Sequence, residues 1–157
     1  MSAAPDPLNS APAPWPDLAG RIDGPRHVLP IRVYYEDTDF SGLAYHASYL
    51  RWCERGRSDW LRLLGVHHNK LLAAPDPAAF VVRKLCIDYL KPARIDEVLE
   101  VVSRCAGLTS ATLTLGQQVL RAGVLLAEVE VLVVLVNAAG RPLRLPAVVR
   151  GAFGGEG

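Results

Sequence analysis

The architecture follows from residues 32–62, which read RVYYEDTDFSGLAYHASYLRWCERGRSDWLR. The β-branched and aromatic segment 28–35 leads into acids, Thr, Ser and Gly at 36–42, so a strand is expected to run into a turn. From about 47 to 64, large apolar residues recur at steps of three and four, which predicts one long helix. Gly65 follows the last of them and suits a helix C-terminus.

The second half of the chain is rich in strand-like segments. Four are predicted, at residues 80–90, 98–108, 110–120 and 124–136. Only short breaks separate them, so βαβ crossovers are absent and the sheet should be mostly antiparallel. Gly56 at mid-helix costs about 1 kcal/mol relative to alanine, which suits a close approach of the sheet. We therefore expect an α+β hotdog fold, with one long helix wrapped by a curved antiparallel sheet of about five strands.

Composition limits the classes of protein to which the chain can belong. With 157 residues, 50% of them hydrophobic and 21% charged, it fits one globular domain. The net charge of +1 and the scattered basic residues predict no nucleic-acid partner. Three cysteines, Cys53, Cys86 and Cys105, fit neither a zinc site nor a disulfide framework, so a reducing cytoplasm is expected. No cofactor or metal is predicted.

The ends of the chain differ in composition from its middle. Residues 1–28 are rich in Pro and Ala and are predicted to be a disordered leader without the features of a secretory signal. The domain is expected over 29–150, followed by a mobile tail at 151–157. The longest apolar run, 124–136, contains two glutamates and is shorter than the roughly 20 residues of a membrane span. No membrane span is therefore expected.

Three acids gather on the turn before the helix. Glu36, Asp37 and Asp39 lie within four residues, and His46 follows where the helix should begin. A helix N-terminus offers unpaired N–H groups and the positive end of a dipole. Beside a carboxylate, it suits acyl transfer, because the N–H polarises a carbonyl while the carboxylate attacks or activates water. Solvated acids that cap the helix would give the same pattern, so spacing alone leaves both readings open.

Several segments together resemble a known family. Residues 32–62, 80–101 and 127–146 are similar in order and spacing to the tol-pal system-associated acyl-CoA thioesterases, within the 4-hydroxybenzoyl-CoA thioesterase family. The motif D-x-D-x-x-G-x-x-Y-H begins at Asp37, and the likeness spans about 30–148. It implies hydrolysis of acyl-CoA to free acid and CoA. It also implies a homodimer or homotetramer, with the active site built across the dimer interface.

The resemblance assigns roles to four residues of the motif. It implies that Asp39 is the catalytic carboxylate and that Gly42 lets the loop turn toward the helix. The backbone N–H of His46 would polarise the thioester carbonyl, with its imidazole as an assistant. Tyr45 would line the acyl pocket, although a core aromatic is an equal reading of that position.

Basic residues after the helix are candidates for gripping the CoA phosphates. These are Arg83, Lys84 and Lys91, with Arg94 close by, because cationic side chains bind phosphate by charge-assisted hydrogen bonds. Solvated charge at a strand edge is the alternative.

Other charged residues are expected to have structural roles. Glu36 and Asp37 are interpreted as loop-ordering residues, since repulsion keeps neighbouring carboxylates from sharing one site. Glu54 is expected to pair with Arg57 or to hydrogen-bond the loop, and Asp59 is expected on the solvated face of the helix.

Two other functions remain open at this point. A non-catalytic acyl-binding hotdog domain is disfavoured by the acid at position 39. A hydratase would carry its histidine and acid in a different motif on the helix, which this chain lacks. The length of the acyl chain and the choice between CoA and acyl carrier protein thioesters are left open.

Overall fold

The computed structural model describes residues 20–154 of the chain. In chain order the elements are β1 (Arg21–Asp23), β2 (Arg26–Arg32), the 3-10 helix η1 (Tyr35–Asp37), α1 (His46–Leu63), α2 (His68–Ala73), β3 (Ala78–Tyr89), β4 (Val98–Leu108), β5 (Thr112–Arg121), β6 (Val124–Asn137) and α3 (Ala147–Gly154). The expected α+β hotdog fold is confirmed. The sheet has six strands, one more than the sequence predicted.

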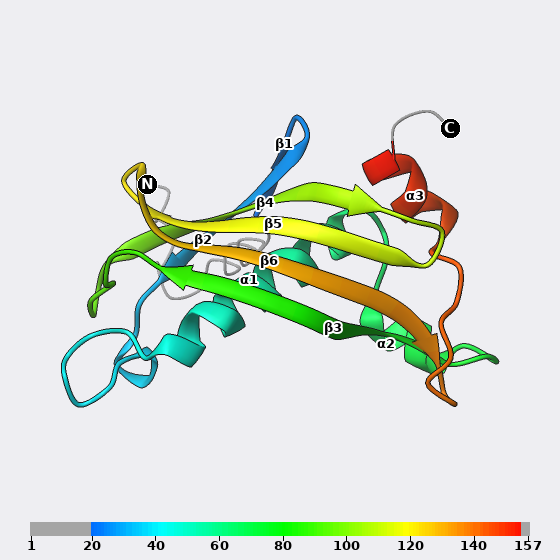
Figure 1. Cartoon of the computed structure of the whole chain (residues 1–157), viewed down its shortest axis with the longest axis horizontal. Helices are drawn as coiled ribbons and strands as arrows, with labels where there is room; N and C mark the ends of the chain where they lie inside the picture. Colours follow the sequence, from blue (N-terminus) through cyan, green and yellow to red (C-terminus); the bar gives the residue numbers. More distant parts are fainter. Residues whose placement is uncertain (1–19, 155–157) are drawn as a thin grey trace, which may run out of the picture.

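The sheet is antiparallel throughout and lies over α1 (Figure 1). Its strand order is β1-β2-β4-β5-β6-β3, so β3 forms one edge and the short β1 forms the other. Alternate residues of the central strands face the helix and are buried there. They form the core with the apolar face of α1: Leu99, Val101, Leu113, Leu115, Val129, Val131, Tyr49, Trp52 and Trp60.

The helix and the sheet approach each other most closely at Gly56. A Cβ at this position would lie 3.0 Å from Cγ1 of Val101 and 3.4 Å from Nε2 of Gln117. The side-chain amide of Gln117 donates to the carbonyl of Cys53 at 2.8 Å and to the hydroxyl of Ser103 at 2.8 Å. A buried polar link thus ties α1 to the sheet beside the glycine, as the expected close approach requires.

The N-terminal boundary of the domain differs from the prediction. Residues 20–28, expected in the leader, form β1 and the start of β2. Asp59 holds this segment, because one of its oxygens accepts the N–H of Gly20 at 2.8 Å and lies 2.6 Å from Nε2 of His27. The expectation that Asp59 is solvated was therefore wrong, since the residue is buried. Residues 1–19 of the predicted leader lie outside the described residues.

The C-terminal boundary also differs. Residues 151–154, expected in the mobile tail, belong to α3, and the Phe153 ring lies 4.5 Å from the Trp60 ring, centroid to centroid. Val149 on the same helix is fully buried. The domain therefore extends to at least residue 154, and the rest of the predicted tail falls outside the described residues.

Substitution of Gly56 tests how the helix packs. Gly56→Val is expected to lower the free energy of unfolding by about 2–3 kcal/mol, because the added methyl groups have no space against Val101. Denaturant titration of both proteins measures the difference. The matched control is Gly151→Ala in α3, where a Cβ meets nothing within 4 Å, and this change should be neutral or stabilising by up to about 1 kcal/mol. Equal stability of Gly56→Val and the wild type would contradict the close packing.

Candidate active site

Asp37 organises the loop between β2 and α1. Its buried carboxylate accepts the backbone N–H of Tyr34 at 2.9 Å. Its carbonyl oxygen accepts the N–H of Tyr45 at 2.7 Å and the hydroxyl of Ser48 at 2.9 Å. The loop is thereby fastened to the first turn of the helix, in agreement with the expected loop-ordering role. Glu36, by contrast, is exposed to solvent.

Asp39 lies exposed at the outer part of the loop. One of its oxygens, Oδ1, accepts both the hydroxyl and the backbone N–H of Ser41, the latter at 2.8 Å. These bonds hold the pKa of Asp39 below its ordinary value, with smaller contributions from the backbone of Leu43 and the charge of His46. Gly42 turns the chain with a φ of +80°, a conformation that favours glycine. The carboxylate is therefore ionised at neutral pH, and within residues 20–154 Ser41 is the one side chain that hydrogen-bonds to it.

The N-terminus of α1 is open. The helix begins at His46, its N-cap residue Tyr45 gives no side-chain cap, and the first turn holds no acid. The backbone N–H groups of His46 and Ala47 donate to no group within residues 20–154. Within the described residues the positive end of the helix dipole is therefore uncompensated and can receive an oxygen that carries negative charge.

A groove of about 330 Å³ lies at this helix start, lined by Leu43, Ala44, His46, Tyr49, Tyr89, Leu90, Lys91 and Pro92. Asp39 lies on a neighbouring hollow with Phe40 and Gly42 rather than in the groove itself. Of the residues predicted from sequence, the groove thus brings His46 and Lys91 together. Asp39 stands beside the groove.

Two tyrosines that the sequence analysis missed build one wall of the groove. The hydroxyl of Tyr89 donates to the carbonyl oxygen of His46 at 2.8 Å, and its ring packs edge-on against Tyr49 at 5.3 Å. The hydroxyl of Tyr49 accepts the N–H of Ala93 at 2.9 Å. Burial raises the pKa of both phenols, so they stay protonated. The sequence signal that could have revealed Tyr89 is the alternation of inward and outward residues along β3, which places Tyr89 on the face toward the helix.

The remaining predicted site residues lie elsewhere. Tyr45 is part-exposed, with its ring centroid 4.3 Å from that of His46, so it is not a core aromatic. Arg83 is the extra residue of a β-bulge in β3, and Lys84 follows it on the free edge. Both are exposed, and neither lines the groove of its own chain. Of the basic residues predicted to bind phosphate, Lys91 lines the groove.

The described residues contain no group of three His, Cys, Asp or Glu side chains that could hold a metal ion. The three cysteines are free. Among residues 20–154, neither α1 nor any other helix has the length and apolar character of a membrane span.

Comparison with known proteins connects this geometry to a family. A sequence profile of the Thioesterase-like superfamily matches residues 33–153, which include the loop, the groove and the whole of α1. The chain belongs to the Thioesterase-like superfamily. It is a thioester hydrolase, and the solved thioesterases that it resembles share its fold.

Individual relatives match over most of the domain. The chain is 40% identical over 126 residues to the acyl-CoA thioester hydrolase YbgC of Escherichia coli O157:H7, which covers 79% of this chain and 92% of that protein. It is 38% identical to the acyl-CoA thioesterase YbgC of Haemophilus influenzae, covering 80% and 92%. The crystal structure of a probable thioesterase from Bartonella henselae has a TM-score of 0.75 at 39% identity, covering 77% of this chain and 99% of that one.

Tyr89→Phe tests whether the phenol hydroxyl holds the helix start. Loss of its hydrogen bond to the His46 carbonyl should lower kcat for thioester hydrolysis by about five- to tenfold, because the first turn is less firmly positioned. Steady-state kinetics measure the change, with a thermal unfolding curve for each protein. The control is Tyr34→Phe, whose side chain is 61% exposed. If both variants keep wild-type kcat, Tyr89 has no positioning role.

Proposed function

We propose that the protein is an acyl-CoA thioesterase that hydrolyses acyl-CoA to free acid and CoA. Asp39 serves as nucleophile or general base, and the backbone N–H of His46 polarises the thioester carbonyl. The observation that carries this proposal is the N-terminus of α1, uncapped within the described residues, beside the ionised and exposed carboxylate of Asp39. The relatives named as acyl-CoA thioesterases support CoA as the thiol.

The geometry supports two routes. In the general-base route, Asp39 takes a proton from water as the water oxygen bonds to the carbonyl carbon. The oxyanion then accepts the N–H of His46, and the C–S bond breaks to release CoA thiolate. In the covalent route, the carboxylate oxygen bonds to the acyl carbon as the C–S bond breaks and CoA thiolate leaves. Water then hydrolyses the resulting anhydride to the free acid and the Asp39 carboxylate. A thiol with a pKa of about 8.5 leaves readily, so the His46 imidazole has only an assisting role.

The free edge of the sheet supports a two-fold dimer. β3 is 12 residues long and has no neighbour on its outer side within the described chain, and Val81 and Val82 are 41% and 48% exposed. Such an edge invites pairing with another strand. We propose that two β3 strands pair antiparallel, in a homodimer or a homotetramer built from it. With the two strands centred on each other, Arg83 and Lys84 at the middle of β3 lie near the two-fold axis, where we propose that they bind CoA phosphates between the subunits.

Finer assignments rest on the same residues. We propose that the chain belongs to the tol-pal system-associated subgroup, because the histidine that follows Tyr45 is typical of that subgroup. We also propose that the protein works in the cytoplasm, because its free cysteines suit a reducing compartment. Lys91, in the groove, would contact the CoA phosphates. Thioesters on acyl carrier protein are a second substrate class for the same site.

Asp39→Asn is the direct test of the chemical role. The amide keeps the shape of the carboxylate but cannot act as nucleophile or base, so kcat should fall by at least about 100-fold. Detection of free CoA thiol measures the rate, and it also separates hydrolysis from acyl binding and from hydration.

His46→Ala should lower kcat only about tenfold, because the backbone N–H remains.

Glu36→Gln is the matched control, three residues away on the same loop and exposed. It should keep wild-type kcat. An Asp39→Asn protein that retains more than about a tenth of wild-type kcat would rule out Asp39 as the catalytic carboxylate.

Sedimentation tests the proposed assembly. At micromolar concentration the mass should be two or four times the 17.0 kDa of one chain, because the β3 edge is then covered. A fully active monomer of 17.0 kDa would contradict the dimer and the placement of Arg83 and Lys84 at a shared site.

A further inference from the structure

The segment 90–97 connects β3 to β4 and lines one side of the groove with its first three residues. Its fourth residue, Ala93, is fully buried, and its carbonyl oxygen accepts the N–H of Ala44 at 2.8 Å. Ala44 lies on the stretch of chain that leads from Asp39 to His46. The position of the segment therefore sets how this stretch approaches the start of α1.

The peptide group between Pro92 and Ala93 is held from two sides. Its N–H donates to the hydroxyl oxygen of Tyr49 at 2.9 Å, and its carbonyl oxygen accepts Nη1 of Arg121 at 3.1 Å. Tyr49 is buried on α1, and Arg121 is the last residue of β5. Because a peptide group is planar, the two bonds together fix its orientation. This one peptide thus joins the helix to the sheet beside the groove.

The same nitrogen of Arg121 also binds Glu97, at the other end of the segment. Nη1 lies 2.9 Å from Oε2 and 3.2 Å from Oε1 of Glu97, and Oε2 also accepts the backbone N–H of Arg94 at 2.9 Å. Desolvation raises the pKa of Glu97, but the Arg94 N–H and the Arg121 guanidinium outweigh it and hold the pKa below its ordinary value. Arg121 therefore ties both ends of the segment to β5 through an ionised partner.

Stability of the fold is a weak reason for this ion pair. The side chains of Arg121 and Glu97 are 34% and 26% exposed. Ion pairs that water reaches contribute little to the free energy of folding, because solvent screens them and two long side chains must be ordered. The bond from Arg121 to the Pro92 carbonyl is the contact that carries the effect of the pair to the groove.

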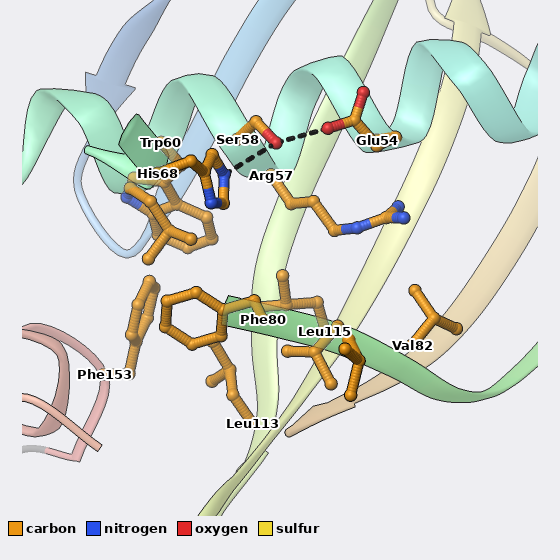
Figure 2. Close-up of a pocket in the computed structure, with 13 residues that line it drawn as sticks. Glu54, Arg57, Ser58, Trp60, His68, Phe80, Val82, Leu113, Leu115 and Phe153 are labelled. Carbon is orange, nitrogen blue, oxygen red and sulfur yellow. Dashed lines mark hydrogen bonds between the residues drawn. The ribbon is translucent and has the colours of Figure 1, made fainter. Parts of the chain in front are cut away.

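Arg57 on α1 has no comparable set of partners. In the described part of the chain its one hydrogen bond is a long one, 3.3 Å from Nη1 to Oε1 of Gln117. Glu54 accepts the Ser58 hydroxyl at 2.5 Å instead, as a dashed line in Figure 2 shows. The Glu54–Arg57 pair expected from sequence is thus not formed. Of the ion pairs within residues 20–154, the one formed by Arg121 is the pair that holds a wall of the groove.

We propose that Arg121 is a positioning residue for thioester hydrolysis, which acts through the Pro92–Ala93 peptide and Ala44 on the chain between Asp39 and the start of α1. Arg121 is not among the described residues that line the groove, so it touches no reacting atom. A displacement of about 1 Å in an active site can cost about 100-fold in rate. The inference rests on the roles proposed above for Asp39 and the helix start.

Arg121→Met tests the proposal in the full-length protein, with acetyl-CoA, octanoyl-CoA and benzoyl-CoA as substrates. For the best of the three, kcat should fall by about five- to tenfold while KM stays within about twofold. Arg121→Lys should keep about half of wild-type kcat, because all the bonds come from one nitrogen that an ammonium can replace. The matched control is Arg26→Met, which breaks the exposed ion pair with Asp23 at the β1–β2 turn and should leave kcat unchanged.

Glu97→Gln tests whether the pair acts as a unit. It should lower kcat by about threefold, because Arg121 then lacks the charge that orients it. The double variant Arg121→Met/Glu97→Gln should lose no more than Arg121→Met alone, since two residues in one network are not additive. Losses that multiply in the double variant would overturn the proposal. A thermal unfolding curve for each variant shows that it is folded at the assay temperature, and Glu97→Gln alone carries the test if Arg121→Met does not fold.

Amide hydrogen exchange, followed by NMR without any thioester, measures the positional link itself. The N–H of Ala44 should exchange about tenfold faster in Arg121→Met than in the wild type, and at the wild-type rate in Arg26→Met. Wild-type kcat in Arg121→Met, or an unchanged Ala44 exchange rate, would overturn the proposal. A raised KM with unchanged kcat would overturn it as well, because Arg121 would then contact the CoA phosphates. Failure of the wild type to hydrolyse any acyl-CoA would overturn the proposed function, whereas the exchange result needs no hydrolysis.

Discussion

The packing of α1 against the curved sheet is the constraint from which the site follows. Trp52 is fully buried, and Gly56 brings the helix backbone within contact of β4, so the axis of the helix is fixed by its central turns. Its first turn is then held at the rim of the sheet, at His46, where the N–H groups have no partner among residues 20–154. The reactive end of the helix is thus positioned by packing that lies two to three turns away.

Two aspartates two residues apart show how environment separates structural from chemical roles. Asp37 is buried and its carboxylate accepts a backbone N–H, so it holds the loop in place. Asp39 is exposed and is held through one oxygen by Ser41. The same side chain therefore serves the fold in one position and is available for chemistry in the other.

Local sequence patterns predicted most of the fold, whereas features that depend on contacts between residues far apart in the chain were missed. The long helix was visible because its apolar residues recur at steps of three and four, and the strand at 98–108 because it is rich in Val and Leu and bounded by short breaks. β1 was missed because it has three residues in a Pro- and Gly-rich segment, and its anchor, Asp59, lies far along the chain. For the site, Asp39 and His46 share one motif and could be found together, whereas Tyr89 meets His46 only after β3 folds against the helix.

The most direct test of the central claim is the carbonyl stretching frequency of a bound thioester, measured by Raman difference spectroscopy on the inactive Asp39→Asn protein. If the helix N-terminus polarises the carbonyl, the frequency should fall on binding relative to free substrate. Adding His46→Ala to the same protein should preserve the shift, because the donor is the backbone N–H. An unshifted frequency for a fully bound thioester would contradict the account.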